Sequence, residues 1–418
     1  MTRIFGGGRK RWRDGRERDK IGLTTMTSTR ILHGHCLDVL ATLPDNSVHC
    51  VVTSPPYYGL RDYKTPEVSF PAGTFTPVAG LPSMALPAWT GHLGLEPDPW
   101  QFVGHMVQIF REVRRVLRED GTLWLNFGDS YANDTKWGGS TGGKHVNGLH
   151  GKSGVGRTKQ ITGLKPKDLI LMPARVALAL QADGWYLRSD IIWHKPNPMP
   201  ESVTDRPTKA HEYIFLMSKS ERYFYDAEAI KEAVTGNAHA RGDGVNAKAK
   251  TPGANSRIHK THVGAAPQPR QNESWSAAVA GLVDSRNKRT VWTVATSPYP
   301  DAHFATYPPD LIRPCILAGT SARGCCPDCG APWERVTATI TTGWKPGCDC
   351  YTMHALTDMP PEEWPTVPAV VLDPFGGSGT TAEVAQEYAR TAIVIELGEH
   401  HLPLIKRRLN TTPGLNLH

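Results

Sequence analysis

The hydrophobic pattern of this 418-residue chain alternates between short apolar runs and longer segments whose apolar positions recur every three to four residues. The short runs predict strands, and the longer segments predict amphipathic helices. Strands are expected near residues 31–32, 48–52, 122–127, 185–193, 212–217, 370–372 and 392–395. Helices are expected at 99–117, at 169–184, at 309–318 and in a last segment that ends near 409. Residues 64–92 are rich in Pro, Gly and Thr and are predicted to form a long loop.

The apolar run at 48–52 leads through Thr53 into Ser54, Pro55, Pro56 and Tyr57. Neither proline has an N–H group to donate, so the hydrogen-bonding ladder of the strand stops there. The stiff turn that remains brings free carbonyls, a hydroxyl and an aromatic ring to one point. The carbonyl of Pro55 and the oxygen of Ser54 can accept hydrogens from a planar NH2 group, and Tyr57 can stack on its face. Taken alone, these residues are better explained as an ordinary exit from a strand.

A second candidate segment begins at Asp373, directly after the strand expected at 370–372. Its glycines let the backbone approach a ligand closely, and Thr380 starts a helix, so the segment is typical of a strand-to-helix corner that holds a nucleoside. Glu396 ends the next strand, about twenty residues after the glycines, where an acid can accept both ribose hydroxyls. A tight turn without a ligand is the alternative.

Five of the eight cysteines lie between residues 325 and 350. Cys326 and Cys329 form a C-x-x-C knuckle followed by glycine, and Cys348 and Cys350 supply a second pair. Four thiolates suit tetrahedral zinc, and the absence of a histidine or open ligand position among them indicates a structural metal rather than a catalytic one. The alternative is four unligated thiols in a loop. Cys325 is a spare neighbour, and the remaining cysteines are expected to be ordinary buried thiols: Cys36, Cys50 and Cys315.

The formal net charge of +7 suits a polyanionic partner. Residues 1–27 are interpreted as a basic disordered arm, unless Met26 is the true start. Residues 134–163 are interpreted as a basic loop that orders on a polyanionic partner, with plain disorder as the alternative. The basic residues 227–290 are interpreted as an insert too poor in large apolar side chains to form a strong core alone. No apolar run spans a bilayer and no signal peptide is apparent, so a cytoplasmic protein is expected.

Three stretches together resemble the S-adenosylmethionine-dependent amino-group DNA methyltransferases: S-P-P-Y at 54–57, D-P-F-G-G-S-G-T-T at 373–381 and H-F-A-T-Y at 303–307. The catalytic turn precedes the cofactor loop, which is the permuted order of the β group, and the resemblance covers most of 28–226 and 291–410. It implies a doubly wound, Rossmann-like α/β sheet. The expected divisions are a catalytic half at 28–226, a target-recognition insert at 227–290, a cofactor segment at 291–322, a zinc ribbon at 323–352 and a second cofactor half at 366–410.

The resemblance also implies roles for single residues. Ser54 and Pro55 would accept the hydrogens of the target amine and free its lone pair, while Tyr57 stacks on a base flipped out of the duplex. The implied wall of the base pocket is formed by Trp193, Lys195 and Asn197. His35 stands where the family usually has an acid that helps to bind the cofactor. The implied contacts of S-adenosylmethionine are Asp373, Phe375, Gly377, Ser378, Gly379, Thr380, Glu396, His303, Phe304 and Thr306.

A serine before the two prolines is more typical of family members that act on N4 of cytosine in double-stranded DNA. N6 of adenine is the alternative, because this position does not separate the two groups cleanly. An RNA or protein amide substrate, or a DNA-binding module without activity, also stays open. The sequence leaves undecided which DNA site is recognised, which oligomer forms and whether a partner restriction endonuclease exists.

Overall fold

The computed structural model describes residues 28–60, 63–132, 163–233, 285–297, 306–337, 341–353 and 360–410. The predicted basic arm, nearly all of the predicted loop at 134–163 and most of the predicted insert at 227–290 lie outside these residues. His303 and Phe304 also lie outside them. Among the described residues, no helix is long and apolar enough to cross a membrane.

An eight-stranded sheet lies at the centre, in the order β1-β16-β15-β2-β7-β9-β8-β12. Its strands are β1 (Thr29–His33), β2 (Val48–Thr53), β7 (Leu117–Phe127), β8 (Tyr186–His194), β9 (His211–Ser218), β12 (Val291–Thr293), β15 (Val370–Asp373) and β16 (Thr391–Glu396). Neighbouring strands run parallel except where β9 pairs with β7 and β8. The antiparallel β9 therefore brings its first residues to the edge where the other strands end.

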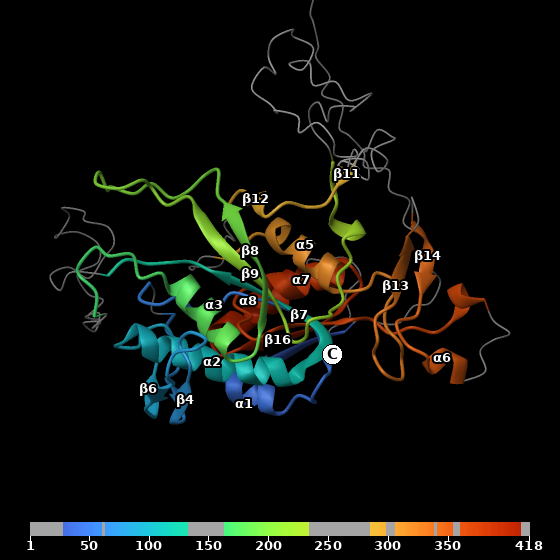
Figure 1. Ribbon diagram of the computed structural model, residues 1–418, viewed down its shortest axis with the longest axis horizontal. Coiled ribbons are helices and arrows are strands. Elements are labelled where there is room, and N and C mark those ends of the chain that lie inside the picture. Colours follow the sequence, from blue (N-terminus) through green and yellow to red (C-terminus); the bar gives the residue numbers. More distant parts are fainter. Residues whose placement is uncertain are drawn as a thin grey trace, which may run out of the picture.

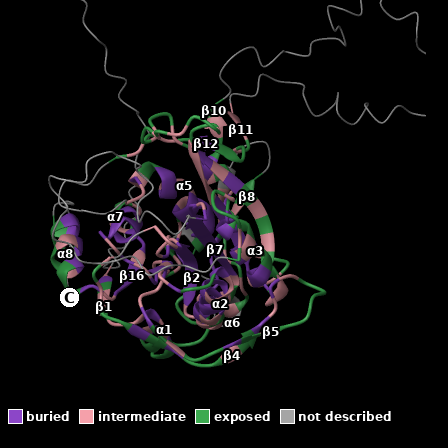
Figure 2. Cartoon of the chain, turned by 90° about the vertical axis from the view of Figure 1, so that its left-hand side faces the viewer, coloured by how far each residue is buried: buried purple, intermediate pink, exposed green. Residues whose placement is uncertain are grey.

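Helices cover both faces of this sheet (Figures 1 and 2). One layer contains α1 (Cys36–Ala41), α2 (Pro99–Val116) and α3 (Met172–Ala182), and the other contains α5 (Pro309–Gly319), α7 (Thr380–Glu387) and α8 (Leu402–Asn410). Each layer packs on its own hydrophobic cluster. Because both faces are covered, all six residues of β2 are buried, as expected for the central strand of a parallel sheet. The predicted α/β architecture is confirmed.

Helix α2 shows how local sequence sets these elements. Asp98 caps the helix by accepting a hydrogen bond from the backbone N–H of Trp100 at 2.6 Å, and Pro99 occupies the first helical position. The apolar side predicted from the helical spacing is buried against the sheet, with Phe102 and Phe110 fully inaccessible. Burial of two such rings contributes about 4 kcal/mol or more to folding.

Two predictions about element boundaries are wrong. Strand β7 begins at Leu117 rather than at 122, because Leu117 already pairs with Val48 ahead of an irregularity in the ladder. Residues 64–92 are not one loop but contain two small antiparallel pairs. These are β3 (Val68–Phe70) with β6 (Trp89–Gly91), and β4 (Gly73–Phe75) with β5 (Met84–Leu86). Each strand has three residues, which is too short for alternation to be recognised in the sequence.

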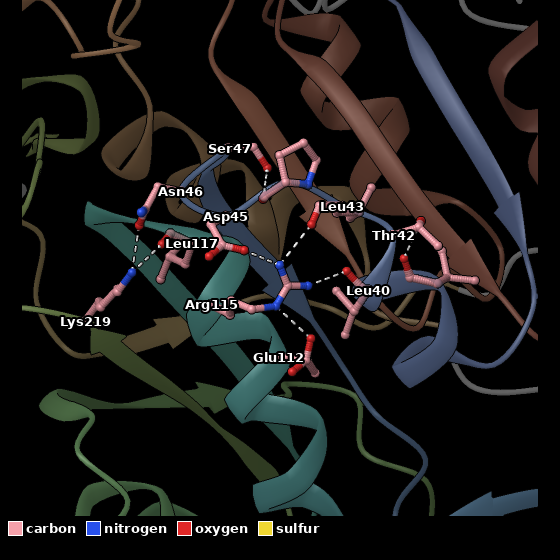
Figure 3. Close-up of polar contacts among 12 residues, drawn as sticks. Leu40, Thr42, Leu43, Asp45, Asn46, Ser47, Glu112, Arg115, Leu117 and Lys219 are labelled. Carbon is pink, nitrogen blue, oxygen red and sulfur yellow. Dashed lines mark hydrogen bonds and ion pairs between the residues drawn. The ribbon is translucent and has the colours of Figure 1, made fainter.

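Arg115 on α2 fixes the connection that leads from α1 into β2 (Figure 3). Its guanidinium donates to the carbonyl oxygens of Leu40 at 2.7 Å and Leu43 at 3.0 Å, and it also pairs with the carboxylates of Asp45 and Glu112. The planar guanidinium group, with five N–H donors, suits such convergent acceptors. The central strand that leads to Ser54 is therefore held firmly at its start.

A small lobe extends from one side of the sheet (Figure 1). It contains β13 (Glu334–Thr337), β14 (Thr341–Lys345) and α6 (Cys350–Met353). The backbone of Cys325 exchanges two hydrogen bonds with Val367, at 2.7 and 2.8 Å. Val367 therefore belongs structurally with this lobe, beyond the boundary at 352 expected from sequence. A further short pair, β10 (Glu232–Ala233) with β11 (Ser285–Arg286), flanks the segment that the structure does not describe.

Candidate active site

The candidate site lies where the central strands β15 and β2 end side by side. Val371 and Leu372 pair with Cys50 and Val51, so the next residues of both strands emerge at the same edge of the sheet. There Thr53 Oγ1 donates a hydrogen bond to Asp373 Oδ1 at 2.7 Å, although the two residues are 320 positions apart. In open α/β sheets, ligands bind at this carboxyl edge. The predicted catalytic turn and the predicted cofactor loop are thus directly joined.

The polar groups of the turn form one hydrogen-bonded cluster. Ser54 Oγ donates to Tyr57 Oη at 3.2 Å, and Tyr57 Oη donates to Glu212 Oε2 at 2.8 Å. The side-chain amide of Asn126 donates to Tyr57 Oη at 2.7 Å and lies 3.3 Å from both Ser54 Oγ and Glu212 Oε2. On its other oxygen, Glu212 is ion-paired with the ammonium group of Lys195.

Tyr57 is held tightly on one side. Its ring stacks on Phe127, with ring centroids 5.4 Å apart and an interplanar angle of 21°. Gly128 allows this position, because a Cβ atom there would lie only 2.5 Å from the Tyr57 ring. Burial, and secondarily the negative charge of Glu212, raise the pKa of Tyr57 well above its usual value. The phenol is therefore a neutral donor at physiological pH. Pro55 is buried behind it, and Pro56 is half-buried.

Asp373 is fully engaged by groups of the chain itself. Its Oδ1 accepts from Thr53 Oγ1 and from the backbone N–H of Phe375 at 3.0 Å. Its Oδ2 accepts from Tyr307 Oη at 3.0 Å and from Thr381 Oγ1 at 2.6 Å. A carboxylate offers about four acceptor sites. The side chain is 1% exposed, so the structure places it as the internal anchor of the loop rather than as a surface that faces a ligand.

The hydroxyls of Ser378 and Thr380 face helix α8. Both accept from Arg408 Nη1 at 2.6 Å, which ties the cofactor loop to the last helix. The loop itself requires glycine, because Gly377 and Gly379 have φ values of 53° and 80°. Sequence reasoning assigned Ser378 and Thr380 to the cofactor, whereas in the structure their side chains contribute to the shape of the loop.

Glu396 lies at the end of β16, beside the loop. Its Oε2 accepts from the backbone N–H of Gly377 at 2.7 Å, and its Oε1 accepts from the N–H of Gly398 at 2.7 Å and lies 2.9 Å from His401 Nδ1. The predicted pairing of an acid with the glycine loop is thus present. Phe375 is half-buried and packs against the hydrophobic cluster on the side of α1, α2 and α3. Thr306 is half-buried and precedes Tyr307.

His35 caps helix α1 without a side-chain hydrogen bond. Its ring meets the edge of Phe70 with centroids 5.1 Å apart, and its buried Nε2 has no hydrogen-bond partner among the described residues. Burial lowers the pKa of His35. A neutral imidazole therefore stands at the position where the family usually carries an acid.

The predicted wall residues of the base pocket differ in what they contact. Lys195 reaches the cluster through Glu212, and its ammonium lies 4.2 Å from the ring centroid of Trp193. Trp193 itself is 3% exposed, packs in the second hydrophobic cluster and donates to the Val294 carbonyl at 2.8 Å. Asn197 exchanges hydrogen bonds with the backbone of Thr296. Of the three, Lys195 belongs to the cluster around the turn, whereas Trp193 supports it from the core.

Sequence reasoning missed three residues that the structure brings to this edge: Asn126, Glu212 and Tyr307. Asn126 interrupts the apolar strand Thr122–Phe127, and Glu212 stands at the start of the apolar β9. A polar residue inside a buried strand is costly unless it has a partner or a task, and this was the available signal. Asp129, near the end of β7, stabilises the start of α3. Its Oδ1 accepts from the N–H of Met172 at 3.0 Å, where α3 begins.

The four predicted metal ligands come together in the small lobe. One sulfur from each of Cys326, Cys329, Cys348 and Cys350 lies within 4.8 Å of all the others. Gly330, with φ of 72°, donates its N–H to the Cys326 carbonyl at 2.9 Å and closes the knuckle. Trp333 and Tyr351 pack around the cluster. Cys36, Cys50 and Cys315 are buried, as expected, and the spare neighbour Cys325 is buried as well.

Comparisons with known proteins place the chain among the methylases. The family model N6_N4_Mtase, described as DNA methylase, matches residues 48–329 and 366–407. Type II methyltransferase M.Cfr9I of Citrobacter freundii is 36% identical over 389 residues, which are 92% of this chain and 88% of that protein. Type II methyltransferase M.SmaI of Serratia marcescens is 36% identical over 386 residues, 92% of each chain.

A solved structure, PvuII DNA methyltransferase (cytosine-N4-specific), aligns with 94% of this chain and 89% of its own, at 14% identity and a TM-score of 0.48. The family model and the two type II relatives show that this chain belongs to the N6_N4_Mtase family of DNA methylases. The resemblance inferred from the three sequence motifs is thereby confirmed.

Proposed function

We propose that this protein is a site-specific DNA methyltransferase that moves a methyl group from S-adenosylmethionine to the exocyclic N4 of cytosine in double-stranded DNA. The observation that carries the proposal is the hydrogen bond of 2.7 Å between Thr53 and Asp373. It joins a turn whose acceptors suit an amine to a loop whose backbone suits a nucleoside, and a methyl transfer needs both in one place.

At the turn, Ser54 Oγ and the Pro55 carbonyl accept the two hydrogens of the target amine. This draws the amine nitrogen toward tetrahedral geometry and frees the lone pair that the base ring otherwise delocalises. Tyr57 stacks on the base once the base has left the duplex. Hydrogen bonds from Asn126 hold the side chains of Ser54 and Tyr57 in position. Most of the rate enhancement then comes from positioning and electrostatics.

The cofactor loop fits S-adenosylmethionine, which supplies an activated methyl group on its sulfonium. Gly377 adopts a left-handed conformation that keeps side chains out of the way, and the Glu396 carboxylate lies 2.7 Å from its N–H group. Glu396 is positioned to accept the ribose hydroxyls, and the half-buried ring of Phe375 offers an apolar surface. Asp373 supports this arrangement from beneath the loop. His303 and Phe304 are proposed as further contacts on the strength of the family resemblance.

Cytosine N4 is preferred to adenine N6 because a serine, not an aspartate, precedes the two prolines. The net charge of +7 fits a polyanionic substrate such as DNA. Residues 227–290, which contain β10 and β11 and directly precede β12, are proposed as the recognition insert on the basis of their basic composition.

The Cys326, Cys329, Cys348 and Cys350 cluster holds a structural zinc ion. Zn–S bonds of about 2.3 Å place tetrahedral sulfurs about 3.8 Å apart, which the observed spread of at most 4.8 Å can accommodate. One zinc per chain is expected by metal analysis of the purified protein, and chelation should lower its melting temperature. Cys36→Ser is the control that should keep the metal. Metal-free protein with an unchanged melting temperature and four reactive thiols would argue against the zinc site.

The function is tested by sequencing DNA from cells that express the protein, with a method that reports N4-methylcytosine and N6-methyladenine separately. N4-methylcytosine at one short motif, absent in cells expressing Tyr57→Ala, would support the proposal. N6-methyladenine would keep the family and change the substrate. No modified base, with the cofactor still bound by the purified protein, would favour an RNA or protein substrate or an inactive module.

A further inference from the structure

The proposed function leaves one proton without a destination. When the amine nitrogen bonds to the methyl carbon, the carbon–sulfur bond breaks, its electron pair stays on sulfur, and the nitrogen becomes positively charged until it loses a proton. The inference below rests on the proposed function and concerns where this proton goes.

The hydrogen bonds around the turn have a definite direction. Ser54 Oγ donates to Tyr57 Oη, and Tyr57 Oη donates to Glu212 Oε2. With its hydrogen pointing at Tyr57, the oxygen of Ser54 is free to accept from an incoming amine. Ser54 Oγ, Tyr57 Oη and Glu212 thus form a row of hydrogen-bonded groups. Each hydroxyl in the row can take a proton on one side while it releases its own proton on the other. The row ends at a carboxylate.

The other groups in contact with the row cannot take the proton. Asn126 is a neutral amide whose nitrogen donates to Tyr57, and Lys195 has no acceptor. Asp373 lies on the other loop, with its oxygens occupied by four donors of the chain. Among the described residues, Glu212 is the carboxylate that hydrogen-bonds to the turn.

Asn126 gives independent evidence that a ligand group completes this cluster. Its side chain is 4% exposed, and its Oδ1 has no hydrogen-bond partner among the described residues. A buried acceptor without a donor costs free energy, and a donor group of a bound ligand would satisfy it. The amide nitrogen of the same side chain touches both Ser54 and Tyr57, so such a donor would lie beside these two hydroxyls.

We propose that Glu212 is the terminal proton acceptor of the methyl transfer, reached from the target amine through Ser54 Oγ and Tyr57 Oη. In this step the amine proton passes to Ser54 Oγ, the Ser54 proton passes to Tyr57 Oη, and the Tyr57 proton passes to Glu212 Oε2. The hydroxyls are regenerated and one carboxylate becomes a carboxylic acid. One positive charge on the cofactor and one negative charge on Glu212 disappear together, so the step conserves charge.

The surroundings of Glu212 suit this task. Its side chain is 16% exposed, so the proton can afterwards leave to solvent. The positive groups that face it are Lys195, which directly follows β8, and Lys209, which precedes β9. His211 precedes Glu212 directly, and burial lowers the pKa of that imidazole, so His211 is neutral at physiological pH. The phenol of Tyr57 also stays neutral, as a relay group must.

The test is a single-turnover methylation assay across pH, with enzyme in excess over a DNA duplex that carries the identified site. For the wild-type enzyme, the rate should rise with pH along an acid limb and then level off, as expected when the proton acceptor must be ionised. Glu212→Gln should lower the plateau about 100-fold, in the range typical of a lost general base, and should remove this acid limb. Tyr57→Phe keeps the stacking ring but breaks the row, so it should also lose the limb.

Two further variants separate proton transfer from structure. Glu212→Asp keeps a carboxylate and should restore the acid limb, with a rate above that of Glu212→Gln. Glu334→Gln removes an ion-paired glutamate on β13, in the small lobe, and should behave as wild type. Cofactor and DNA affinities of each variant are measured by equilibrium titration and should stay within about threefold of wild type.

The inference fails if Glu212→Gln keeps the wild-type pH profile, whether its rate is unchanged or uniformly lower. A lower rate with the limb retained, together with weaker DNA binding, would make Glu212 a structural residue. A wild-type enzyme that methylates no DNA amine would overturn the proposed function itself, and this outcome is visible before any variant is compared.

Discussion

The cofactor loop and the catalytic turn lie at the same edge of the sheet but differ in how completely the chain satisfies their polar groups. In the loop, Asp373 accepts four hydrogen bonds, and the hydroxyls of Ser378 and Thr380 are taken by Arg408. In the turn, Asn126 Oδ1 has no partner among the described residues, and Ser54 Oγ retains acceptor capacity. The loop is shaped in advance by the protein, whereas the turn keeps acceptors for a substrate.

This difference separates two kinds of residue that sequence motifs group together. Residues with saturated side chains hold the backbone that meets the ligand, and their loss should appear in stability. Residues with unused acceptors meet the reacting groups, and their loss should appear in rate. Substitutions in the loop should therefore change stability, and substitutions in the turn should change rate.

The largest effect is expected for Tyr57→Ala at the turn. Loss of base stacking and of the hydroxyl that links Ser54 to Glu212 should cost about 4 kcal/mol in the transition state, or about a thousandfold in single-turnover rate. Cofactor affinity should change less than about threefold. The matched control is Tyr186→Ala, since that tyrosine is 45% exposed on β8. Equal losses of rate and cofactor affinity would remove the distinction between turn and loop.

A somewhat smaller effect, of a different kind, is expected for Asp373→Ala. Removing this carboxylate leaves several buried donors unsatisfied, so the free energy of unfolding should fall by about 3 kcal/mol. Tyr307→Phe removes one of those hydrogen bonds and should cost about 1 kcal/mol. Both are measured by urea unfolding, with cofactor titration alongside. If Asp373→Ala lost cofactor binding at unchanged stability, the carboxylate would be a ligand contact and not an anchor.

At the turn, a smaller effect on rate than that of Tyr57→Ala is expected for Ser54→Ala. The Pro55 carbonyl still accepts one amine hydrogen, so the rate should fall by about 2 kcal/mol, or roughly thirtyfold, because one hydrogen bond and the first relay group are lost. The free energy of unfolding should stay within about 0.5 kcal/mol of wild type, as for a half-exposed site. A large loss of stability would show that Ser54 belongs with the saturated residues of the loop.

Local pattern predicted much of the frame and failed where elements are short. The helical spacing of α2 and the apolar run of β2 were sufficient to predict these two elements, because a long buried face produces a recognisable hydrophobic pattern in the sequence. The three-residue strands between 68 and 91 are too short to produce such a pattern. The early start of β7 at Leu117 was missed because that residue also completes the apolar side of α2, and only pairing with Val48 decides between the two.

The candidate site also contains a part that the sequence predicted and a part that it did not. Functional groups that are close in sequence were recognised from sequence, because spacing alone brings them together. Examples are S-P-P-Y, the glycine loop and the cysteine pairs. The contacts of Asn126, Glu212 and Tyr307 were not predicted from sequence. Each of these residues comes from a separate segment that reaches the edge of the sheet through strand order or packing.

The sequence by itself determined the family, the strand-forming runs, the turn at Ser54 and the pairing of four cysteines, since these depend on neighbouring residues. Tertiary structure decided that Asp373 is an anchor, because two of its four donors, Thr53 and Tyr307, come from distant parts of the chain. It also decided that Glu212 meets Tyr57, because only the antiparallel direction of β9 brings the start of that strand to the carboxyl edge of its neighbours.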